Sequence, residues 1–317
     1  QSFGEAFWSP GPCYMENQTS AYVEADSPEP ASYAQGSLWL LMPVFLPWTW
    51  MAFKAYNLWL TVPGFAFGWL VPVLCLVLLG EIWPKRPLLI GSWRAGNVAA
   101  CGLGLICFLL FQTHVAASGS RPASMFALAL SVLLFAGGYL HYLYGPKRWW
   151  CVWFPFAFVA LALPLPSFLY DHLTGWLRLQ VGYLAVELLS VTGIPAQLGG
   201  YLIYLPKGPV GVEEACSGLR SLQSAFMLAV FFGWIYFKSA MARVVLILWG
   251  CVLALMGNVL RVYGLSRMAH DHGFDVIERY HDLTGWIILA MTLGGVVLAV
   301  WVSQRVQRSL HINLQHE

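Results

Sequence analysis

Hydrophobic residues run through this chain in long blocks, and short polar segments separate the blocks. A helix needs about 20 apolar residues to cross the hydrocarbon core of a membrane. Eight blocks approach that length: 37–53, 58–80, 96–117, 122–143, 149–169, 215–237, 243–264 and 283–303. Since lipid excludes open sheet edges, the pattern predicts an all-α polytopic membrane protein with about eight transmembrane helices.

The stretch between the fifth and sixth blocks, residues 170–214, has a different pattern. Residues 173–191 are apolar but include an arginine and a glutamate, which favours an amphipathic helix lying at the membrane interface. Residues 201–205 (YLIYL) alternate, 206–209 (PKGP) form a turn signal, and VGV follows. These features predict a small β-hairpin, so the segment is expected to form a cap beside the membrane.

Composition agrees with a membrane protein. Of 317 residues, 59% are hydrophobic and 10% are charged, whereas a soluble domain carries about 25% charged residues. The net charge of +2 is too small to indicate nucleic-acid binding.

Residues 1–36 contain five acids and no Lys or Arg, and we expect a flexible acidic tail. Met15 is the first methionine and a candidate natural start, which would make residues 1–14 additions to the natural chain. Residues 37–317 are expected to form a single transmembrane domain.

The distribution of Lys and Arg predicts sidedness. With both termini inside, the cytoplasmic segments hold nine of them and the external segments six, a bias of the sign that the positive-inside rule requires. The cap at 170–214 then lies outside the membrane, on the extracytoplasmic face.

Three chemically distinct side chains are expected near that outer face. Cys216 lies in EEACSGLRSL at the start of the sixth block, Arg261 in GNVLRV at the end of the seventh, and His281 in HDLTGW just before the eighth. Each alone has an ordinary explanation as filler, a snorkelling cation or an interfacial residue. Together they supply the nucleophile, cation and proton carrier that acyl transfer needs.

The thiol needs activation, since a free cysteine is only a few per cent thiolate at neutral pH. If Cys216 lies in the first helical turn, the unpaired backbone N–H groups favour its thiolate. Arg220 follows one turn later and would help, whereas Glu213 and Glu214 would oppose ionisation unless they face water. In this hypothesis His281 protonates the leaving amine, and Arg261, assisted by Asn258, holds either the oxyanion or the substrate backbone.

The order of these motifs resembles the exosortase/archaeosortase family. EEACSGLRSL is followed by GNVLRV and HDLTGW, and LPLPS, VTGIP and the YLIYLP hairpin precede them, so the similarity covers residues 160–300, the expected catalytic core. Members are multi-pass membrane proteins thought to be cysteine proteases or transpeptidases. Their substrates end in a PEP-CTERM type of sorting signal, in which a short motif precedes a transmembrane helix and a basic tail.

The resemblance implies that Cys216 is the nucleophile and that Arg261 and His281 complete a triad. Beside it, Arg220, Asn258 and Ser217 are our candidates for substrate binding or support. A histidine in the third place favours a bacterial exosortase, because the archaeal branch often has arginine there. The expected location is the bacterial plasma membrane, with the active site on its extracytoplasmic face. The expected partners are the lipid bilayer and membrane-anchored substrates, without cofactor, metal or nucleic acid.

One short phrase occurs twice, as YDHLTGW at 170–176 and YHDLTGW at 280–286. Each copy predicts a histidine just before a helix start, with Asp171 and Asp282 as N-caps. Of the two histidines, only His281 precedes a predicted span and is expected near Arg261. The shared phrase is too short to indicate an internal repeat.

Other functions remain open from the sequence. The histidines of HDH (270–272) with His281 suggest a metal site, but their spacing matches no usual zinc pattern. Ser217 and Ser221 lack the GxSG motif expected of a rhomboid-like serine protease. A transporter is a second alternative, and a noncatalytic scaffold of an envelope or exopolysaccharide export system is a third.

Overall fold

The computed structural model describes residues 38–61, 68, 70–83, 89, 91, 93–119, 121–146, 149–163, 165–212 and 217–314, with the side chains of 38 and 307–314 excepted. The chain divides after Ser167 into two compact units, each described by itself below. The expected acidic tail at 1–36 lies outside the described residues, and so do Glu213, Glu214 and Cys216.

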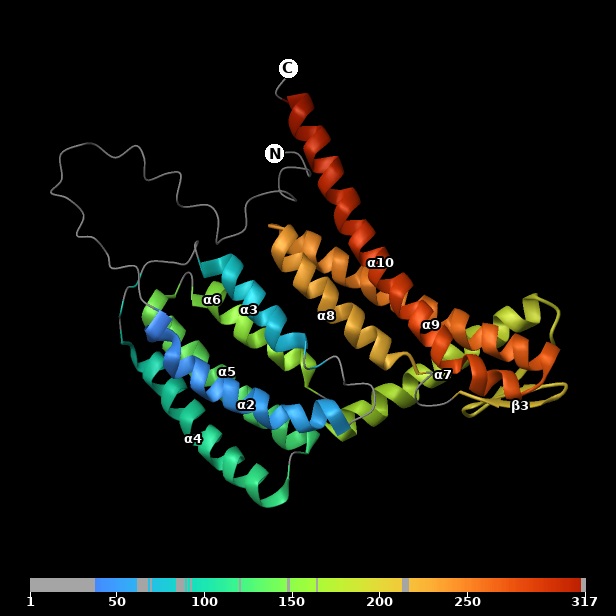
Figure 1. The fold of residues 1–317 in the computed structure, drawn as a ribbon, viewed down its shortest axis with the longest axis horizontal. Helices are drawn as coiled ribbons and strands as arrows, with labels where there is room; N and C mark the ends of the chain where they lie inside the picture. Colours follow the sequence, from blue (N-terminus) through green and yellow to red (C-terminus); the bar gives the residue numbers. More distant parts are fainter. Residues whose placement is uncertain are drawn as a thin grey trace. The chain divides into compact units, whose positions relative to one another are not determined.

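The N-terminal unit is entirely helical in its described part (Figure 1). Its elements are η2 (Leu38–Leu41), α2 (Met42–Thr61), α3 (Leu70–Ile82), α4 (Ala95–Ser118), α5 (Pro122–Tyr144), α6 (Trp149–Phe158) and η5 (Val159–Ala162). Helices α4 and α5 cross closely at two glycines. A Cβ on Gly104 would lie 2.5 Å from the Phe135 nitrogen, and one on Gly138 would lie 2.9 Å from the Cys101 nitrogen. Such small residues let membrane helices approach to backbone contact.

In its described part, the C-terminal unit contains four helices and a small sheet. Its elements are α7 (Ser167–Val191), β1 (Gln197–Gly199), β2 (Leu202–Leu205), β3 (Gly208–Gly211), α8 (Leu219–Tyr236), α9 (Ala240–His272) and α10 (Asp275–Leu314). Helix α9 packs against both α8 and α10. Glycines again make the close contacts, since a Cβ on Gly257 would lie 2.7 Å from Ile288 and one on Gly295 would lie 2.5 Å from Leu253.

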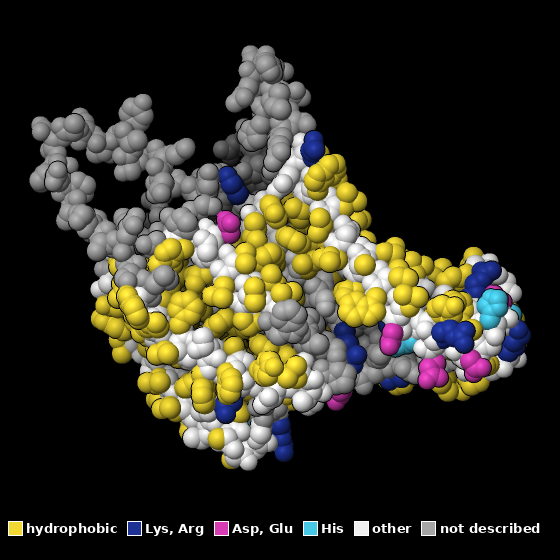
Figure 2. All heavy atoms as spheres, in the orientation of Figure 1, with side chains coloured by type: hydrophobic (Ala, Val, Ile, Leu, Met, Phe, Trp, Pro, Cys, Tyr) yellow, Lys and Arg dark blue, Asp and Glu magenta, His cyan; other side chains and the backbone are white. Residues whose placement is uncertain are grey.

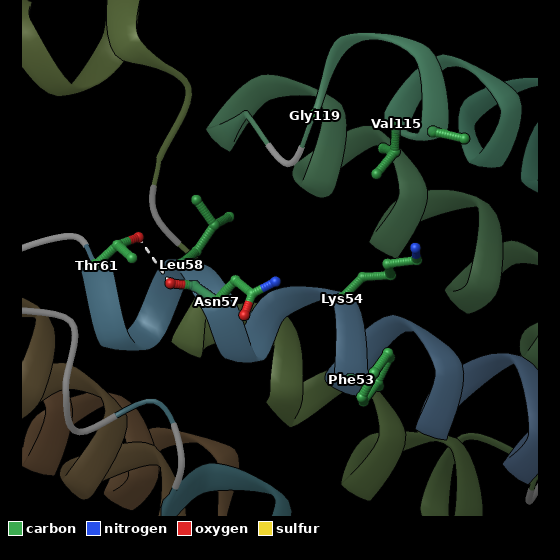
Figure 3. Close-up of a pocket in the computed structure, with 8 residues that line it drawn as sticks. Phe53, Lys54, Asn57, Leu58, Thr61, Val115 and Gly119 are labelled. Carbon is green, nitrogen blue, oxygen red and sulfur yellow. Dashed lines mark hydrogen bonds between the residues drawn. The ribbon is translucent and has the colours of Figure 1, made fainter.

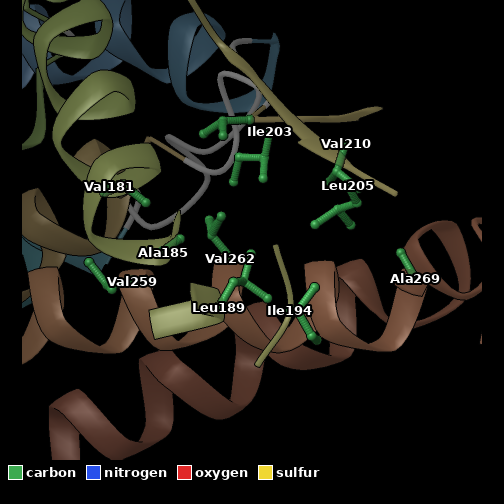
Figure 4. Packing of buried hydrophobic residues seen from close by; sticks show 11 residues of the cluster. Val181, Ala185, Leu189, Ile194, Ile203, Leu205, Val210, Val259, Val262 and Ala269 are labelled. Carbon is green, nitrogen blue, oxygen red and sulfur yellow. The ribbon is translucent and has the colours of Figure 1, made fainter. Parts of the chain in front are cut away.

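The sheet is antiparallel, in the order β1-β2-β3, and one face of it covers a hydrophobic core. Leu202 pairs with both Gly199 and Gly211, which sets the register of the two ladders. Side chains from α7, the sheet and α9 fill the core beneath it, as Figure 4 shows. The sheet is therefore fixed to the same helix, α9, that carries Asn258 and Arg261.

The surface and the helix lengths agree with a multi-pass membrane protein. Five described helices are long and apolar enough to cross a membrane, or six if the broken segment from Trp149 to Val191 counts as one span. Hydrophobic side chains cover much of the visible surface along α9 and α10, whereas charged and histidine side chains gather around the sheet end of α9 (Figure 2). A protein in water buries such apolar surface, so these faces are suited to lipid.

The all-α polytopic fold and the hairpin at 201–212 are confirmed, but several boundaries differ from the prediction. The eight blocks give five to six candidate spans, and β1 is a third strand that the pattern did not reveal. The predicted break between 37–53 and 58–80 is wrong, because α2 continues through Lys54 and Asn57 to Thr61. A helix accommodates such polar side chains where its end approaches the interface.

The helix starts predicted from the LTGW phrases are also wrong. Helix α7 begins at Ser167 and α10 at Asp275, so Asp171 and Asp282 are inside helices and cannot be N-caps. Helix α9 extends to His272, which places HDH in its last turn. At about 1.5 Å per residue, α9 and α10 exceed the thickness of the hydrocarbon core, and their polar ends remain helical beyond it.

Candidate functional site

Arg261 and His281 are brought together by the packing of α9 against α10. The Arg261 Nη2 group donates a hydrogen bond of 2.8 Å to the backbone oxygen of His281, and its Nε group donates one of 3.3 Å to Thr284 Oγ1. The Thr284 hydroxyl in turn donates to the same His281 oxygen at 2.9 Å. Arg261 thus holds one turn of α10 through two contacts, and hydrogen bonds to a charged group are stronger than neutral ones.

Gly285 provides the space into which the Arg261 guanidinium fits. A Cβ at this position would lie 3.2 Å from Arg261 Nη2 and 3.4 Å from its Cζ. The guanidinium therefore packs against the backbone of α10, in contact that a larger residue would disturb. This explains a glycine inside a helix, where it destabilises by about 1 kcal/mol relative to alanine.

The imidazole of His281 has a carboxylate partner on the next residue. His281 Nδ1 lies 3.0 Å from Asp282 Oδ1, and the Asp282 side chain is 93% exposed. If Nδ1 carries the proton it donates to this carboxylate, an arrangement that leaves Nε2 as the basic nitrogen. The exposed pair is worth little as a stabilising contact, because water screens it.

The chain immediately after Cys216 is held against α9. Gly218 has φ +81° and is the N-cap of α8, and the Leu219 N–H donates to Ser217 Oγ at 3.3 Å. A Cβ on Gly218 would lie 2.8 Å from Asn258 Nδ2. Ser217 and Asn258 are buried, with 2% and 1% of their surfaces exposed.

Helix α8 begins at Leu219, and residue 216, which the prediction placed in the first helical turn, lies outside the described residues. In the sequence, Gly218 indicates the start of α8, because glycine readily adopts the left-handed conformation that interrupts a helix. Asn258 and Arg261 are one turn apart on α9. The same stretch of α9 therefore contacts both the start of α8, two residues beyond Cys216, and the turn of α10 that contains His281.

Arg220 lies in the first turn of α8, and its Nε atom is buried. Among the described residues this Nε has no hydrogen-bond partner. A buried donor without a partner costs roughly 1–3 kcal/mol. The structure thus places an uncompensated polar donor within four residues of Cys216.

Two further histidines, His172 and His270, lie elsewhere in the described part of the chain. His172 is exposed on α7, and His270 pairs with Asp271 near the end of α9, with 3.0 Å between Nδ1 and Oδ1. No group of three or more His, Cys, Asp or Glu side chains that could hold a metal occurs among the described residues. Thr284, Gly285 and Asp282 also belong to the arrangement around Arg261 and His281, although the sequence gave no reason to assign them a catalytic role. The only feature that drew attention to them was the repeated phrase that contains LTGW.

The N-terminal unit also contains a cavity of about 440 Å³ (Figure 3). It lies between α2 and the end of α4, and Lys54 and Asn57 contribute to its lining. Thr61 Oγ1 donates a hydrogen bond of 2.7 Å to the Asn57 backbone oxygen within the last turn of α2. The lining residues include a cation but no thiol or imidazole, so this cavity lacks the groups for acyl transfer.

Comparison with known proteins gives one family. A family model described as transmembrane exosortase matches residues 59–298, which is most of the chain and includes all the residues of the site. No curated protein and no solved structure matched the chain.

Proposed function

Since the chain belongs to the transmembrane exosortase family, we propose that it is a membrane-embedded cysteine protease or transpeptidase. Cys216 is the nucleophile in this proposal, His281 the acid and base, and Arg261 the cation that stabilises negative charge. Its substrates are exported proteins with a C-terminal sorting signal, and it cleaves that signal through a thioacyl intermediate.

The observation that carries the proposal is that one stretch of α9 contacts both the start of α8 and the first part of α10. Arg261 binds the turn of α10 that holds His281, and Asn258, one turn earlier, contacts Gly218 near Cys216. A nucleophile and its base come from distant parts of the sequence in many hydrolases, so contact in space is the relevant test.

The proposed reaction begins when His281 accepts the Cys216 proton and the thiolate attacks the carbonyl carbon of the scissile peptide bond. The carbonyl oxygen becomes an oxyanion, and the C–N bond then breaks as His281 gives its proton to the leaving amine. The product is a thioester between Cys216 and the new C-terminus. Water or an amine attacks this thioester, and the Cys216 thiol is regenerated.

Arg261 and Asn258 act on charge that develops during the reaction. Preorganised donors near an oxyanion are worth about 10²–10³ in rate each, because they need no reorganisation. The contacts of Arg261 with His281 and Thr284 fix its guanidinium in advance. Ser217 holds the start of α8, and Arg220, whose buried Nε has no partner among the described residues, is assigned to binding a substrate carbonyl or carboxylate.

The Lys and Arg distribution supports a site on the extracytoplasmic face of the membrane, and the bacterial plasma membrane is the location proposed with it. A substrate anchored by one transmembrane helix would reach this site in the plane of the bilayer. The cap formed by α7 and the sheet lies on the same end of α9 as Arg261.

The decisive experiment is co-expression with a substrate that carries a C-terminal sorting signal. Cys216→Ala is expected to insert and fold normally but to leave the substrate uncleaved, whereas His172→Ala, a change of an exposed histidine, should cleave it at the wild-type rate. Mass spectrometry of the processed substrate would report the cut site and the acceptor together. Normal cleavage by Cys216→Ala would refute the proposal, and a transporter or scaffold function would then be tested.

A further inference from the structure

A second cavity of the N-terminal unit, of about 520 Å³, lies between α4, α5 and α6. Its volume is within the range of about 300–1,000 Å³ that is usual for small-molecule sites. Every residue assigned to the proposed reaction belongs to the C-terminal unit. The cavity therefore needs a separate explanation.

One end of the cavity is apolar. Leu130, Leu133 and Leu134, from the middle of α5, line it together with Ala100 of α4 and Trp153 of α6. The Trp153 Nε1 group donates a hydrogen bond of 3.0 Å to the Leu133 backbone oxygen, which holds the indole against α5. Leu130 and Leu134 are 53% and 38% exposed, so the cavity opens on the outer surface of the helices. In a membrane this end is suited to a hydrocarbon chain that enters from the bilayer.

Polar groups line the other end, where α4 begins and α5 ends. Gly96 and Asn97 lie in the first turn of α4, and His141 lies in the last turn of α5. The Nδ1 atom of His141 is buried and has no hydrogen-bond partner among the described residues. Buried polar atoms are normally hydrogen-bonded, and a ligand in the cavity can supply the missing partner. The cavity thus has an apolar end and a polar end, as an amphiphile has.

The charges around the polar end favour an anion. Arg94 is the exposed N-cap of α4, and none of the ion pairs among the described residues includes it. Its side chain makes no cap hydrogen bond, so the first N–H groups of α4 keep their partial positive charge. Helices α4, α5 and α6 contain no Asp or Glu. A negatively charged group would therefore be stabilised here without a competing carboxylate on these helices.

Aromatic side chains indicate that the polar end lies at the level of the lipid headgroups. Trp93, which is 55% exposed, stacks on Tyr142 with 3.9 Å between the ring centroids. Trp149 lines the cavity at the start of α6, and its ring centroid lies 6.0 Å from that of His141. Trp and Tyr rings concentrate at the membrane–water interface.

We propose that this cavity binds an anionic phospholipid, with one acyl chain between α4, α5 and α6 and the phosphate beside Arg94 and the start of α4. A zwitterionic lipid carries a cation beyond its phosphate, which Arg94 repels, so the site selects a net negative headgroup. The sidedness proposed from Lys and Arg places this end in the cytoplasmic leaflet, where anionic lipids and basic groups attract each other. The inference is independent of the proposed protease function.

Two matched pairs of variants separate the acyl chain from the headgroup. Ala100 lines the cavity, whereas its neighbour Ala99 is exposed and does not. A phenyl ring would therefore fill the cavity in Ala100→Phe but extend into lipid in Ala99→Phe. Arg121 is the matched control for Arg94, because it is also an exposed N-cap arginine without a side-chain cap bond, but at the start of α5.

The test is photo-crosslinking of the purified full-length protein in detergent micelles. The probe is a phosphatidylglycerol with a diazirine in one acyl chain, and the labelled peptides are identified by mass spectrometry. In the wild type the label should concentrate on residues 130–141 of α5, and unlabelled phosphatidylglycerol should compete about fivefold better than phosphatidylcholine. Ala100→Phe should lower this labelling about tenfold or more, because several methylene groups lose their contacts. Ala99→Phe should change it by less than about twofold.

The headgroup variants keep the test decisive if Ala100→Phe does not fold. Arg94→Gln should weaken competition by phosphatidylglycerol about fivefold, the loss expected for one cation near a membrane surface, and leave phosphatidylcholine unchanged. Arg121→Gln should change neither by more than about twofold, and His141→Phe should lower labelling about threefold. Label spread evenly over the lipid-facing helices would indicate annular lipid only and overturn the inference. Equal competition by the two lipids, or equal effects within either matched pair, would overturn it as well.

Discussion

Replacing Gly285 with alanine is expected to disturb the site through Arg261 alone. The new methyl group would lie 3.2 Å from Arg261 Nη2 and 3.4 Å from Cζ, so the guanidinium must move by a few tenths of an ångström. The bond from Nε to Thr284 Oγ1 is already 3.3 Å long and would be lost by that movement. The shorter bond to the His281 oxygen, 2.8 Å, would lengthen but persist.

Two opposing terms set the size of the effect on stability. Alanine in place of glycine stabilises a helix interior by about 1 kcal/mol. Loss of one hydrogen bond to a charged group destabilises by about 1.5–3 kcal/mol. The net change in the free energy of unfolding should therefore be a loss of about 0.5–2 kcal/mol, while the displaced guanidinium lowers the processing rate about tenfold to a hundredfold.

Gly294 provides a control on the same helix. It lies in α10, and a Cβ there would meet no heavy atom within 4 Å. Gly294→Ala should therefore stabilise the protein slightly and leave processing unchanged. The comparison needs thermal unfolding in detergent, together with the rate of substrate cleavage in membranes, for the wild type and both variants.

The reasoning would be wrong if Gly285→Ala cleaved substrate at the wild-type rate. It would also be wrong if Gly294→Ala lost as much activity, because the effect would then follow from any added methyl group on α10. A variant that loses stability but keeps its activity would show that Arg261 stabilises the fold without serving catalysis.

Three further changes test the site. Thr284→Val keeps the shape of the side chain but removes the hydroxyl that accepts from Arg261 and donates to the His281 oxygen. Substrate cleavage should fall about tenfold, and thermal unfolding should show a stability loss of about 0.5–1.5 kcal/mol. His281→Ala should abolish cleavage whereas His172→Ala should not, and equal activities would contradict the assignment. A thiol reagent that cannot cross membranes should label Cys216 in intact spheroplasts of a variant whose other cysteines are replaced, and labelling only after lysis would reverse the proposed sidedness.

The class of fold could be predicted because the membrane imposes it. Long apolar blocks must form helices in lipid, and the alternation at YLIYL indicates a strand wherever it lies. Boundaries were harder, because the sequence pattern marks where a helix enters lipid and not where it begins. Asp275 starts α10 in a polar segment, well before the apolar block at 283, since a helix continues as readily in water once nucleated.

Of the three reactive residues proposed from the sequence, the structure brings Arg261 and His281 together, whereas the residues that support this contact were not expected. Cys216, Arg261 and His281 were proposed because together they supply the nucleophile, the cation and the proton carrier that acyl transfer needs. Thr284 and Gly285 are ordinary residues in a membrane helix, so their roles are visible only in the structure. Thr284 accepts a hydrogen bond from Arg261, and Gly285 leaves space for the Arg261 guanidinium. Arg178 was noticed as a charge that favoured an interfacial helix, whereas its contact with Val212 depends on a strand that is distant in sequence.

The repeated LTGW phrase shows how one local sequence can serve two different contacts. In both copies the glycine leaves a space on a helix that a side chain from another element fills: Tyr201 at Gly175 and Arg261 at Gly285. In the first copy that side chain is covered by Arg178, which also donates to the backbone oxygen of Val212. In the second it holds the turn of His281. The phrase therefore gives a helix with free space beside its glycine. The side chain that fills this space differs between the copies, and it determines what each copy contacts.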